Sequence, residues 1–245
     1  METPTAAMLV IGDEILSGRT RDSNMHHLAK ELTQAGITLA EARVVPDAHA
    51  RIVAAVRALS GDYTHVFTSG GIGPTHDDIT ADAVADAFGT PIGVRADARA
   101  LLVAHYAKTG TELNAARLRM ARIPEGATLI ENPISAAPGF SLHNVHVMAG
   151  VPAIFEAMVA SVLPRLRGGP PVLSRNLRVE VPEGEVAEAL GAAAAVFADV
   201  SMGSYPFIRA GRYGTNLVLR SPDAARLAEA VAHLHATLPA PAVEE

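Results

Sequence analysis

The chain has 245 residues, 49% of them hydrophobic, no cysteine, and a formal net charge of −6. The absence of cysteine excludes disulfides and thiolate chemistry, and a negative chain without a Lys/Arg cluster is not typical of a nucleic-acid-binding protein. No secretion signal is evident and no apolar run approaches the roughly 20 residues of a membrane span, so we expect a soluble cytoplasmic protein that contacts no membrane.

Apolar runs and amphipathic stretches alternate through the first two-thirds of the chain. Strands are predicted at residues 6–11, 37–45, 63–67, 127–130 and 145–149. Helices are predicted at residues 24–35 (with Ser23 as N-cap), 52–59, 79–88, 96–109, 112–122 and 152–167. This βαβα order predicts an α/β fold, a mostly parallel sheet in three layers, over residues 1–167.

The run Gly168-Gly169-Pro170-Pro171 is typical of a linker. Beyond it, strands are predicted at residues 172–181, 200–207 and 216–220, and helices at residues 183–197 and 224–238. This βαββα order predicts a second, smaller α+β domain at residues 172–245, with no catalytic constellation of its own. The tail from residue 239 is expected to fray.

The segment TSGGIGPTHDDIT, residues 68–80, lies between a predicted buried strand and a predicted helix. A glycine-rich turn leaves backbone N–H groups uncovered, and the helix N-terminus adds partial positive charge, so the segment predicts an anion-binding loop. A similar turn closed by an Asp N-cap occurs in many α/β proteins without a ligand, and this alternative stays open. The candidate ligand-binding residues of the loop are Gly70, Gly71, Gly73, Pro74, Thr75 and Thr80.

Asp77 and Asp78 place two carboxylates beside this loop, where they would repel a phosphate. A divalent cation that bridges carboxylate and phosphate oxygens would remove the conflict. Adjacent residues on a helix point roughly 100° apart, so one aspartate could bind the cation while the other caps the helix, and we favour Asp78 as the ligand. His76 is a further candidate by location, whereas His143 and His146 are expected on opposite faces of a strand, a poor metal pair.

Acidic and small residues also follow other predicted strands. In a parallel sheet the ligand site lies at the carboxyl ends of the strands, so Gly12, Asp13, Glu14 and Asp47 are expected to converge with Asp78. A turn or capping role is the alternative for Asp13 and for Asp47. Asn24, Asn132 and Gly139 are further loop candidates. The sequence has no G-x-S-x-G, no P-loop and no G-x-G-x-x-G in a suitable context, which disfavours serine hydrolases, P-loop NTPases and dinucleotide oxidoreductases.

Several of these motifs together resemble a known family. VIGDEILSG with Asp22-Ser23-Asn24, then Val45-Pro46-Asp47, then GGIGPTHDDIT, is similar to the molybdopterin-binding (MoaB/Mog-like) domain family. NPISAAPGF, AGVPAIFEAM, SRN and DVSMGSYPF resemble one branch of it, the N-terminal part of competence/damage-inducible protein A and the molybdopterin-binding-like domain of FAD synthase. The resemblance covers roughly residues 6–221. Ala149 departs from it, because the family often has proline there.

The resemblance implies two kinds of activity. Molybdenum-cofactor proteins bind molybdopterin and adenylate it or insert metal, and their acidic residues match Asp47 and Asp78. The competence-protein branch is associated with metal-dependent hydrolysis of the pyrophosphate in ADP-ribose or FAD-like nucleotides, and the GPTHDD form places this chain on that side. Because no amidase or adenylyltransferase domain follows, neither nicotinamide-nucleotide deamidation nor FAD synthesis is expected.

The leading hypothesis is a nucleotide pyrophosphatase that depends on Mg, Mn or Co. Asp78 and Asp47 would be catalytic, and Asp78, Asp77 and Glu14 would hold the metal. The phosphate-bearing ligand would contact Gly12, Asp13, Asn24, Gly70, Gly71, Gly73, Pro74, Thr75, Thr80 and Gly139. A molybdopterin-binding or adenylyl-transfer protein and a catalytically silent interaction module remain alternatives. The relatives it resembles are often oligomers, which implies a homodimer or homotrimer.

Overall fold

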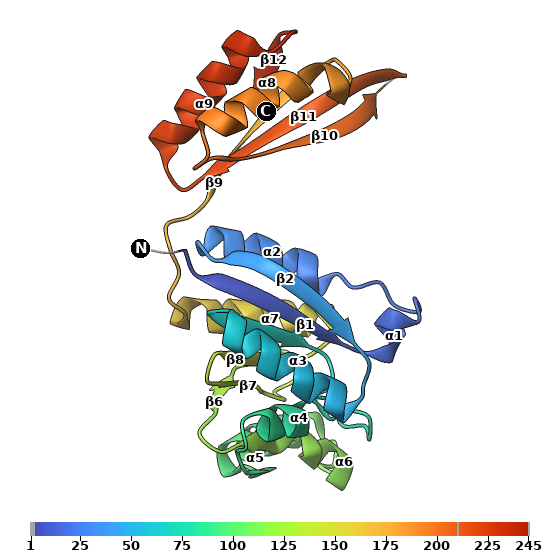
Figure 1. Ribbon diagram of the computed structural model, residues 1–245. Coiled ribbons are helices and arrows are strands. Elements are labelled where there is room, and N and C mark those ends of the chain that lie inside the picture. Colours follow the sequence, from blue (N-terminus) through green and yellow to red (C-terminus); the bar gives the residue numbers. More distant parts are fainter. Residues whose placement is uncertain (1–2, 210, 245) are drawn as a thin grey trace. The chain divides into compact units, whose positions relative to one another are not determined.

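The computed structural model describes residues 3–209 and 211–244 and divides into two compact units, Met1–Gly169 and Pro170–Glu245. A six-stranded sheet in the order β2-β1-β3-β8-β7-β6 forms the centre of the first unit (Figure 1). The first four strands in this order are parallel, and β7 is antiparallel to both of its neighbours, β8 and β6. The strands are β1 (Thr5–Ile11), β2 (Thr38–Val45), β3 (His65–Ser69), β6 (Thr128–Ile130), β7 (Gly139–Leu142) and β8 (Val145–Met148).

Strand β1 shows why helices cover both faces of this sheet. Ala7, Leu9 and Ile11 belong to one hydrophobic core, and the alternating residues Ala6, Met8 and Val10 belong to another. The first core is closed by α3 (His49–Asp62), α4 (Thr80–Ala87) and α5 (Ala96–Thr109), and the second by α2 (Asn24–Gln34) and α7 (Pro152–Val162). The α/β expectation of a three-layer, mostly parallel sheet is therefore confirmed.

The errors of the sequence analysis in this unit concern short elements. The helix predicted at residues 112–122 is wrong, because α6 (Ala115–Leu118) passes into a 3₁₀ turn, η1 (Arg119–Ala121), and then into β5 (Arg122–Pro124). Strand β5 pairs with β4 (Ile92–Val94). The helix α1 (Asp13–Leu16) and strand β7 were not predicted, and α7 is followed by a second 3₁₀ turn, η2 (Leu163–Arg165). Segments this short carry no readable hydrophobic period.

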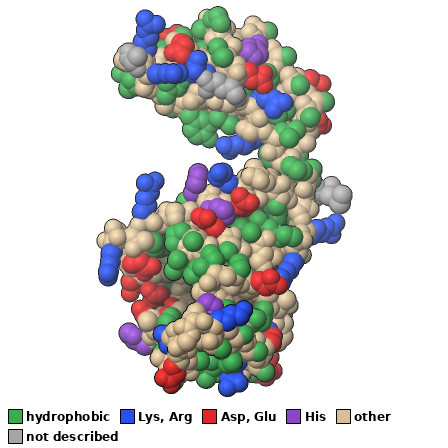
Figure 2. All heavy atoms as spheres, turned by 180° about the vertical axis from the view of Figure 1, so that it is seen from behind, with side chains coloured by type: hydrophobic (Ala, Val, Ile, Leu, Met, Phe, Trp, Pro, Cys, Tyr) green, Lys and Arg blue, Asp and Glu red, His purple; other side chains and the backbone are tan. Residues whose placement is uncertain are grey.

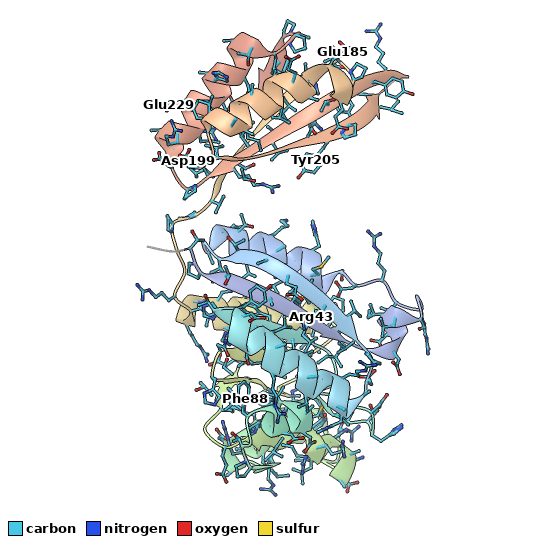
Figure 3. The ribbon with its side chains drawn as sticks, viewed as in Figure 1. Arg43, Phe88, Glu185, Asp199, Tyr205 and Glu229 are labelled. Atoms are coloured by element: carbon cyan, nitrogen blue, oxygen red, sulfur yellow. The ribbon has the colours of Figure 1, made fainter. Side chains whose placement is uncertain are left out.

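The second unit is a four-stranded antiparallel sheet in the order β10-β11-β9-β12, with both helices packed on one face (Figure 1). Arg226 of α9 donates to Asp199 at 2.9 Å, which fixes the helix beside the start of β10, and to Glu229 of the same helix at 2.7 Å (Figure 3 labels both carboxylates). The α+β prediction is confirmed, but the tail does not fray, because β12 pairs with β9. The elements are β9 (Leu173–Val179), α8 (Glu183–Val196), β10 (Ser201–Arg209), β11 (Arg212–Ser221), α9 (Ala224–Thr237) and β12 (Ala242–Glu244).

Across the residues that the structure describes, no helix combines the length and apolar character needed to cross a membrane.

Two histidines lie inside the large sheet. His146 of β8 is 3% exposed, and its Nε2 lies 3.2 Å from Nδ1 of His65 on β3. Its Nδ1 lies 2.9 Å from the Ser141 hydroxyl on β7. Burial, together with the neighbouring His65, lowers the pKa of His146 to about 3. The sequence predicts His143 on the same strand as His146. This prediction is wrong, because His143 lies in the β7–β8 turn, at φ 52°.

Acid is expected to destabilise the fold through His146. The unfolded chain takes up a proton near the usual pKa of 6.5, whereas the folded state keeps this ring neutral down to about 3. Its contribution is therefore present above 6.5 and is lost as the pH falls, by about 1.4 kcal/mol between pH 7.5 and 5.5. Urea denaturation at both pH values should show a smaller difference in His146→Gln and the full difference in His76→Gln, whose side chain is 98% exposed. Equal differences in all three proteins would contradict this account.

Candidate functional site

The loops after the four parallel strands meet at one edge of the large sheet. The amide of Gly12, after β1, donates to the Val45 carbonyl of β2 at 3.2 Å. The next amide, of Asp13, donates to Oδ2 of Asp47 at 2.9 Å. The amide of Gly70, after β3, donates to the Met148 carbonyl of β8 at 3.2 Å. The structure thus brings together three turns that lie far apart in the sequence, as the topology of a parallel sheet requires.

The glycine-rich loop passes closer to its neighbours than other residues would allow. Gly70 has φ +106°, and a Cβ built on it would lie 2.2 Å from the main-chain oxygen of Ile11. Gly71 has φ +69°, and its Cβ would meet the Thr80 hydroxyl at 2.1 Å. Thr80 is fully buried and returns two hydrogen bonds to the loop, from Oγ1 to the Gly70 oxygen and from its amide to the Gly71 oxygen, both 3.0 Å. Thr80 therefore shapes the loop from inside the protein.

Asp78 closes the far end of the same loop. Its Oδ2 accepts hydrogen bonds from the Thr75 amide at 2.8 Å and from the Thr75 hydroxyl at 2.5 Å. Helix α4 begins at Thr80, and its N-cap, Ile79, makes no side-chain cap. The expectation that one of the two aspartates caps the helix is therefore wrong, because both precede it and Asp78 holds Thr75 instead.

Acidic side chains gather beside this loop, and Figure 2 shows red side chains grouped at one edge of the large unit. Burial raises the pKa of Asp47, and the negative charges of Asp13, Glu14 and Asp77 raise it further, against the Asp13 amide that lowers it. The Thr75 side chain lowers the pKa of Asp77 and so keeps that carboxylate ionised. Within residues 3–209 and 211–244, no three His, Asp or Glu side chains are close enough to hold an ion by themselves. Any cation here would need oxygens from a ligand as well.

A cleft of about 520 Å³ opens between the glycine-rich loop and the segments after β6 and β8. Its lining includes two of the acidic candidates, Glu14 and Asp78, and an apolar wall at Ile72, Met120 and Ile154. Asn132 and Ser135 also line it, and Asn132 orders its own turn by accepting from the amides of Ile134 and Ser135 at 3.1 Å. The size, the apolar wall and the few polar groups are typical of a small-molecule site.

The other predicted site residues take different places. Gly70, Gly71, Gly73 and Pro74 line the cleft. Gly139 does not line it but lies in β7, where a Cβ would meet the Val147 oxygen at 2.3 Å, so that close strand packing explains this glycine. The side chain of His76 is 98% exposed, with Nδ1 3.9 Å from Asp77. Outside the cleft lining, but in contact with the loops that form it or within them, are Gly12, Asp13, Asn24, Asp47, Thr75, Asp77 and Thr80.

Asn24, at the start of α2, connects the end of β3 to the loop after β8. It is 4% exposed, and its Nδ2 donates to the Ser69 hydroxyl and to the Gly150 oxygen, both at 2.8 Å. Ser69 is the last residue of β3, and Gly150 follows β8. A Cβ built on Gly150 would lie only 3.3 Å from the Cα of Gly70. The amide of Asn24 therefore sets the spacing between the glycine-rich loop and the opposite wall of the cleft.

Asn24→Ala is expected to lower the free energy of unfolding by about 1–3 kcal/mol, because it leaves the buried Ser69 hydroxyl and the Gly150 carbonyl, in a part-buried hydrogen bond, without their donor. Urea denaturation measures the loss. The neighbouring variant Met25→Ala removes a side chain that is 43% exposed and should stay within about 0.5 kcal/mol of the parent protein. An Asn24→Ala protein as stable as Met25→Ala would show that the amide does not hold these loops.

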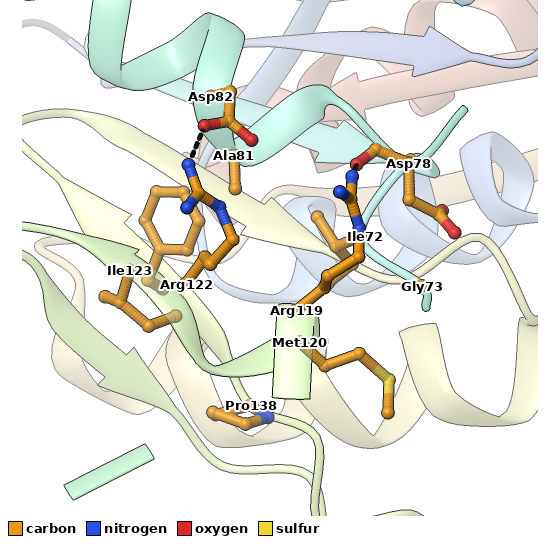
Figure 4. Close-up of a pocket in the computed structure, with 12 residues that line it drawn as sticks. Ile72, Gly73, Asp78, Ala81, Asp82, Arg119, Met120, Arg122, Ile123 and Pro138 are labelled. Carbon is orange, nitrogen blue, oxygen red and sulfur yellow. Dashed lines mark hydrogen bonds and ion pairs between the residues drawn. The ribbon is translucent and has the colours of Figure 1, made fainter. Parts of the chain in front are cut away.

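Two arginines beside the glycine-rich loop, Arg119 and Arg122, are not recognisable as site residues from the sequence. Arg122 pairs with Asp82, and Arg119 donates from Nη2 to the main-chain oxygen of Asp78 at 3.4 Å (Figure 4). Both line a small cavity together with Gly71, Gly73 and Met120. The sequence pattern predicts a helix over RLRMAR. A helix would distribute these arginines around its axis, so the pattern does not predict that two of them point at one loop.

Comparisons with known proteins agree with this architecture. The family described as "Probable molybdopterin binding domain" matches residues 7–168, and the family described as "FAD synthase, middle domain" matches residues 171–245. The crystal structure of the protein CinA with unknown function from Thermoplasma acidophilum is 33% identical, with a TM-score of 0.61, over 66% of this chain and 98% of that one.

Two curated relatives extend the comparison. A protein from Archaeoglobus fulgidus is 33% identical over 199 residues, 81% of this chain and 84% of its own length. A CinA-like protein from Citrifermentans bemidjiense is 39% identical over 167 residues, 66% of this chain. The match spans 40% of the length of that CinA-like relative.

Proposed function

The chain belongs to the molybdopterin-binding domain family and is CinA-like, and from that premise we propose that it is a divalent-metal-dependent pyrophosphatase of nucleotides with a diphosphate bridge, such as ADP-ribose or FAD. The observation that carries the proposal is the position of the glycine-rich loop. Its backbone borders a cleft of about 520 Å³ that is also lined by the carboxylates of Glu14 and Asp78. Backbone amides that bind phosphate, next to carboxylates that bind a cation, suit a diphosphate substrate.

The donor set fits a hard cation shared with phosphate. Magnesium-type sites take one or two carboxylates and complete their coordination with water and substrate phosphates, so one or two acidic side chains suffice. Asp78 and Glu14, which both line the cleft, would hold the ion together with oxygens of the substrate. A bound divalent cation neutralises the diphosphate and lowers the pKa of an attacking water.

The residues of the chain would then perform the hydrolysis as follows. The amides of the glycine-rich loop bind the nonbridging oxygens of one phosphate. Asp47 lies beside the cleft rather than in its lining and would accept the proton of the attacking water through one intervening water, a role that suits a carboxylate whose pKa is raised by burial and by neighbouring acids. The water oxygen bonds to one phosphorus while the bond from that phosphorus to the bridging oxygen breaks, which leaves two monophosphates. For ADP-ribose these are AMP and ribose 5-phosphate.

A pterin phosphate is the second candidate ligand, supported by the description of the matching family. It would use the same loop and cleft, and no hydrolysis would follow. Incubation of the purified protein with ADP-ribose, FAD or AMP, with Mg²⁺, Mn²⁺ or Co²⁺, separates the two. We expect AMP to be released from ADP-ribose and from FAD, and we expect AMP itself not to react. If the protein releases no AMP with any metal but retains a fluorescent pterin through purification, the pyrophosphatase proposal is wrong and pterin binding is supported instead.

A further inference from the structure

Arg119 lies beside the glycine-rich loop, next to Asp78. It lies in η1 and lines a narrow cavity whose lining it shares with Gly71, Gly73 and Asp78. These three residues also line the large cleft, so the two spaces adjoin at the loop. The narrow cavity, about 20 Å³, has no room for a phosphate. A contact between Arg119 and a phosphate would therefore form at the loop itself.

The guanidinium of Arg119 is poorly satisfied by the protein. Its Nη2 reaches the Asp78 oxygen only at 3.4 Å, and its buried Nε has no hydrogen-bond partner within residues 3–209 and 211–244. The neighbouring Arg122 differs, because Asp82 neutralises it (Figure 4). A partly buried cation with a free N–H donor is costly unless something else binds it, and each such group in a native structure calls for an explanation.

A diphosphate supplies that explanation. Its charge is larger than the carboxylate side of the site can balance through one divalent cation. Guanidinium groups bind phosphate oxygens in pairs, through a geometry that lysine cannot reproduce. On the proposed function, the substrate would then contact both a cation held by carboxylates and Arg119.

We infer that Arg119 is the cationic phosphate ligand of this site and binds one phosphate of a diphosphate through the terminal nitrogens of its guanidinium. The inference rests on the proposed function only for the identity of the substrate. Anion binding at Arg119 is measurable whether or not hydrolysis follows.

Titration calorimetry with inorganic pyrophosphate and with ADP-ribose, each at fixed Mg²⁺, tests it. R119Q and R119M are expected to weaken both affinities about 10-fold or more, and R119K to fall between them and the parent protein. The matched control is Arg57→Gln. Arg57 also donates to main-chain oxygens, those of Ala87 and Asp86 at 3.0 and 3.1 Å, but lies away from the cleft, and its loss should leave both affinities unchanged.

The outcomes separate the inference from the proposed function. Weaker pyrophosphate binding in R119Q supports the inference even if the parent protein releases no AMP. The absence of AMP release would contradict only the proposed pyrophosphatase activity. Release of AMP by the parent protein, with unchanged affinities in R119Q and R119M, overturns the inference and leaves Arg119 as a support for the main chain of Asp78. A parent protein that binds neither compound overturns both.

Discussion

Asp78→Asn is expected to lower the rate of AMP release from ADP-ribose by about 100-fold or more at saturating Mg²⁺. The amide keeps the size of the carboxylate and an oxygen that can accept from Thr75, so the loop should keep its shape. It loses the negative charge that would hold the cation in the cleft. The rates are measured by separating AMP from ADP-ribose, together with the melting temperature of each protein.

The matched control is Asp86→Asn, a carboxylate on α4 with a side chain that is 60% exposed and away from the cleft. It should hydrolyse ADP-ribose at the parent rate. If Asp78→Asn keeps the full rate while both variants fold, Asp78 is not part of the site, and a site built on this carboxylate is wrong.

Gly70→Ala is expected to lower the free energy of unfolding by more than about 3 kcal/mol, or to prevent folding altogether. Two effects add. The backbone angle of +106° is unfavourable for alanine, and the new Cβ would overlap the main-chain oxygen of Ile11, which the central strand β1 holds in place. Urea denaturation of the parent and variant proteins measures the loss.

Gly126→Ala separates the two effects. Gly126 has φ +75° but no atom within 4 Å of a built Cβ, so its substitution carries only the backbone cost, about 1 kcal/mol. The difference between the two variants measures how closely the glycine-rich loop approaches β1. If both variants lose the same stability, the close approach at Gly70 has no energetic weight.

The convergence of the loops could be predicted from the sequence because it depends on topology alone. Once β1, β2 and β3 are recognised as parallel strands, their carboxyl ends must share an edge, which is where Asp13, Asp47 and the glycine-rich loop meet. The roles of single residues were harder to predict. Gly139 looks like a loop glycine in the sequence, yet its role depends on the Val147 oxygen of the neighbouring strand.

Contacts between distant segments account for the remaining differences. Strand β12 exists because residues 242–244 pair with β9, a contact that no local pattern encodes. Arg119 reaches the loop only because the chain leaves α6 through a 3₁₀ turn and enters β5. The sequence singles out Asp78 as a carboxylate beside the glycine-rich loop, but its hydrogen bond from Thr75 depends on the shape of the turn. Long elements are thus readable from their period, and tight turns are not.

The dependence of AMP release on metal tests the central claim most directly. Purified parent protein is freed of metal with EDTA, dialysed, and incubated with ADP-ribose while Mg²⁺, Mn²⁺ or Co²⁺ is titrated back. We predict no AMP in the metal-free protein and saturable release of AMP and ribose 5-phosphate as one of the metals is added. Release that does not depend on metal, or no release with any of the three, would contradict it.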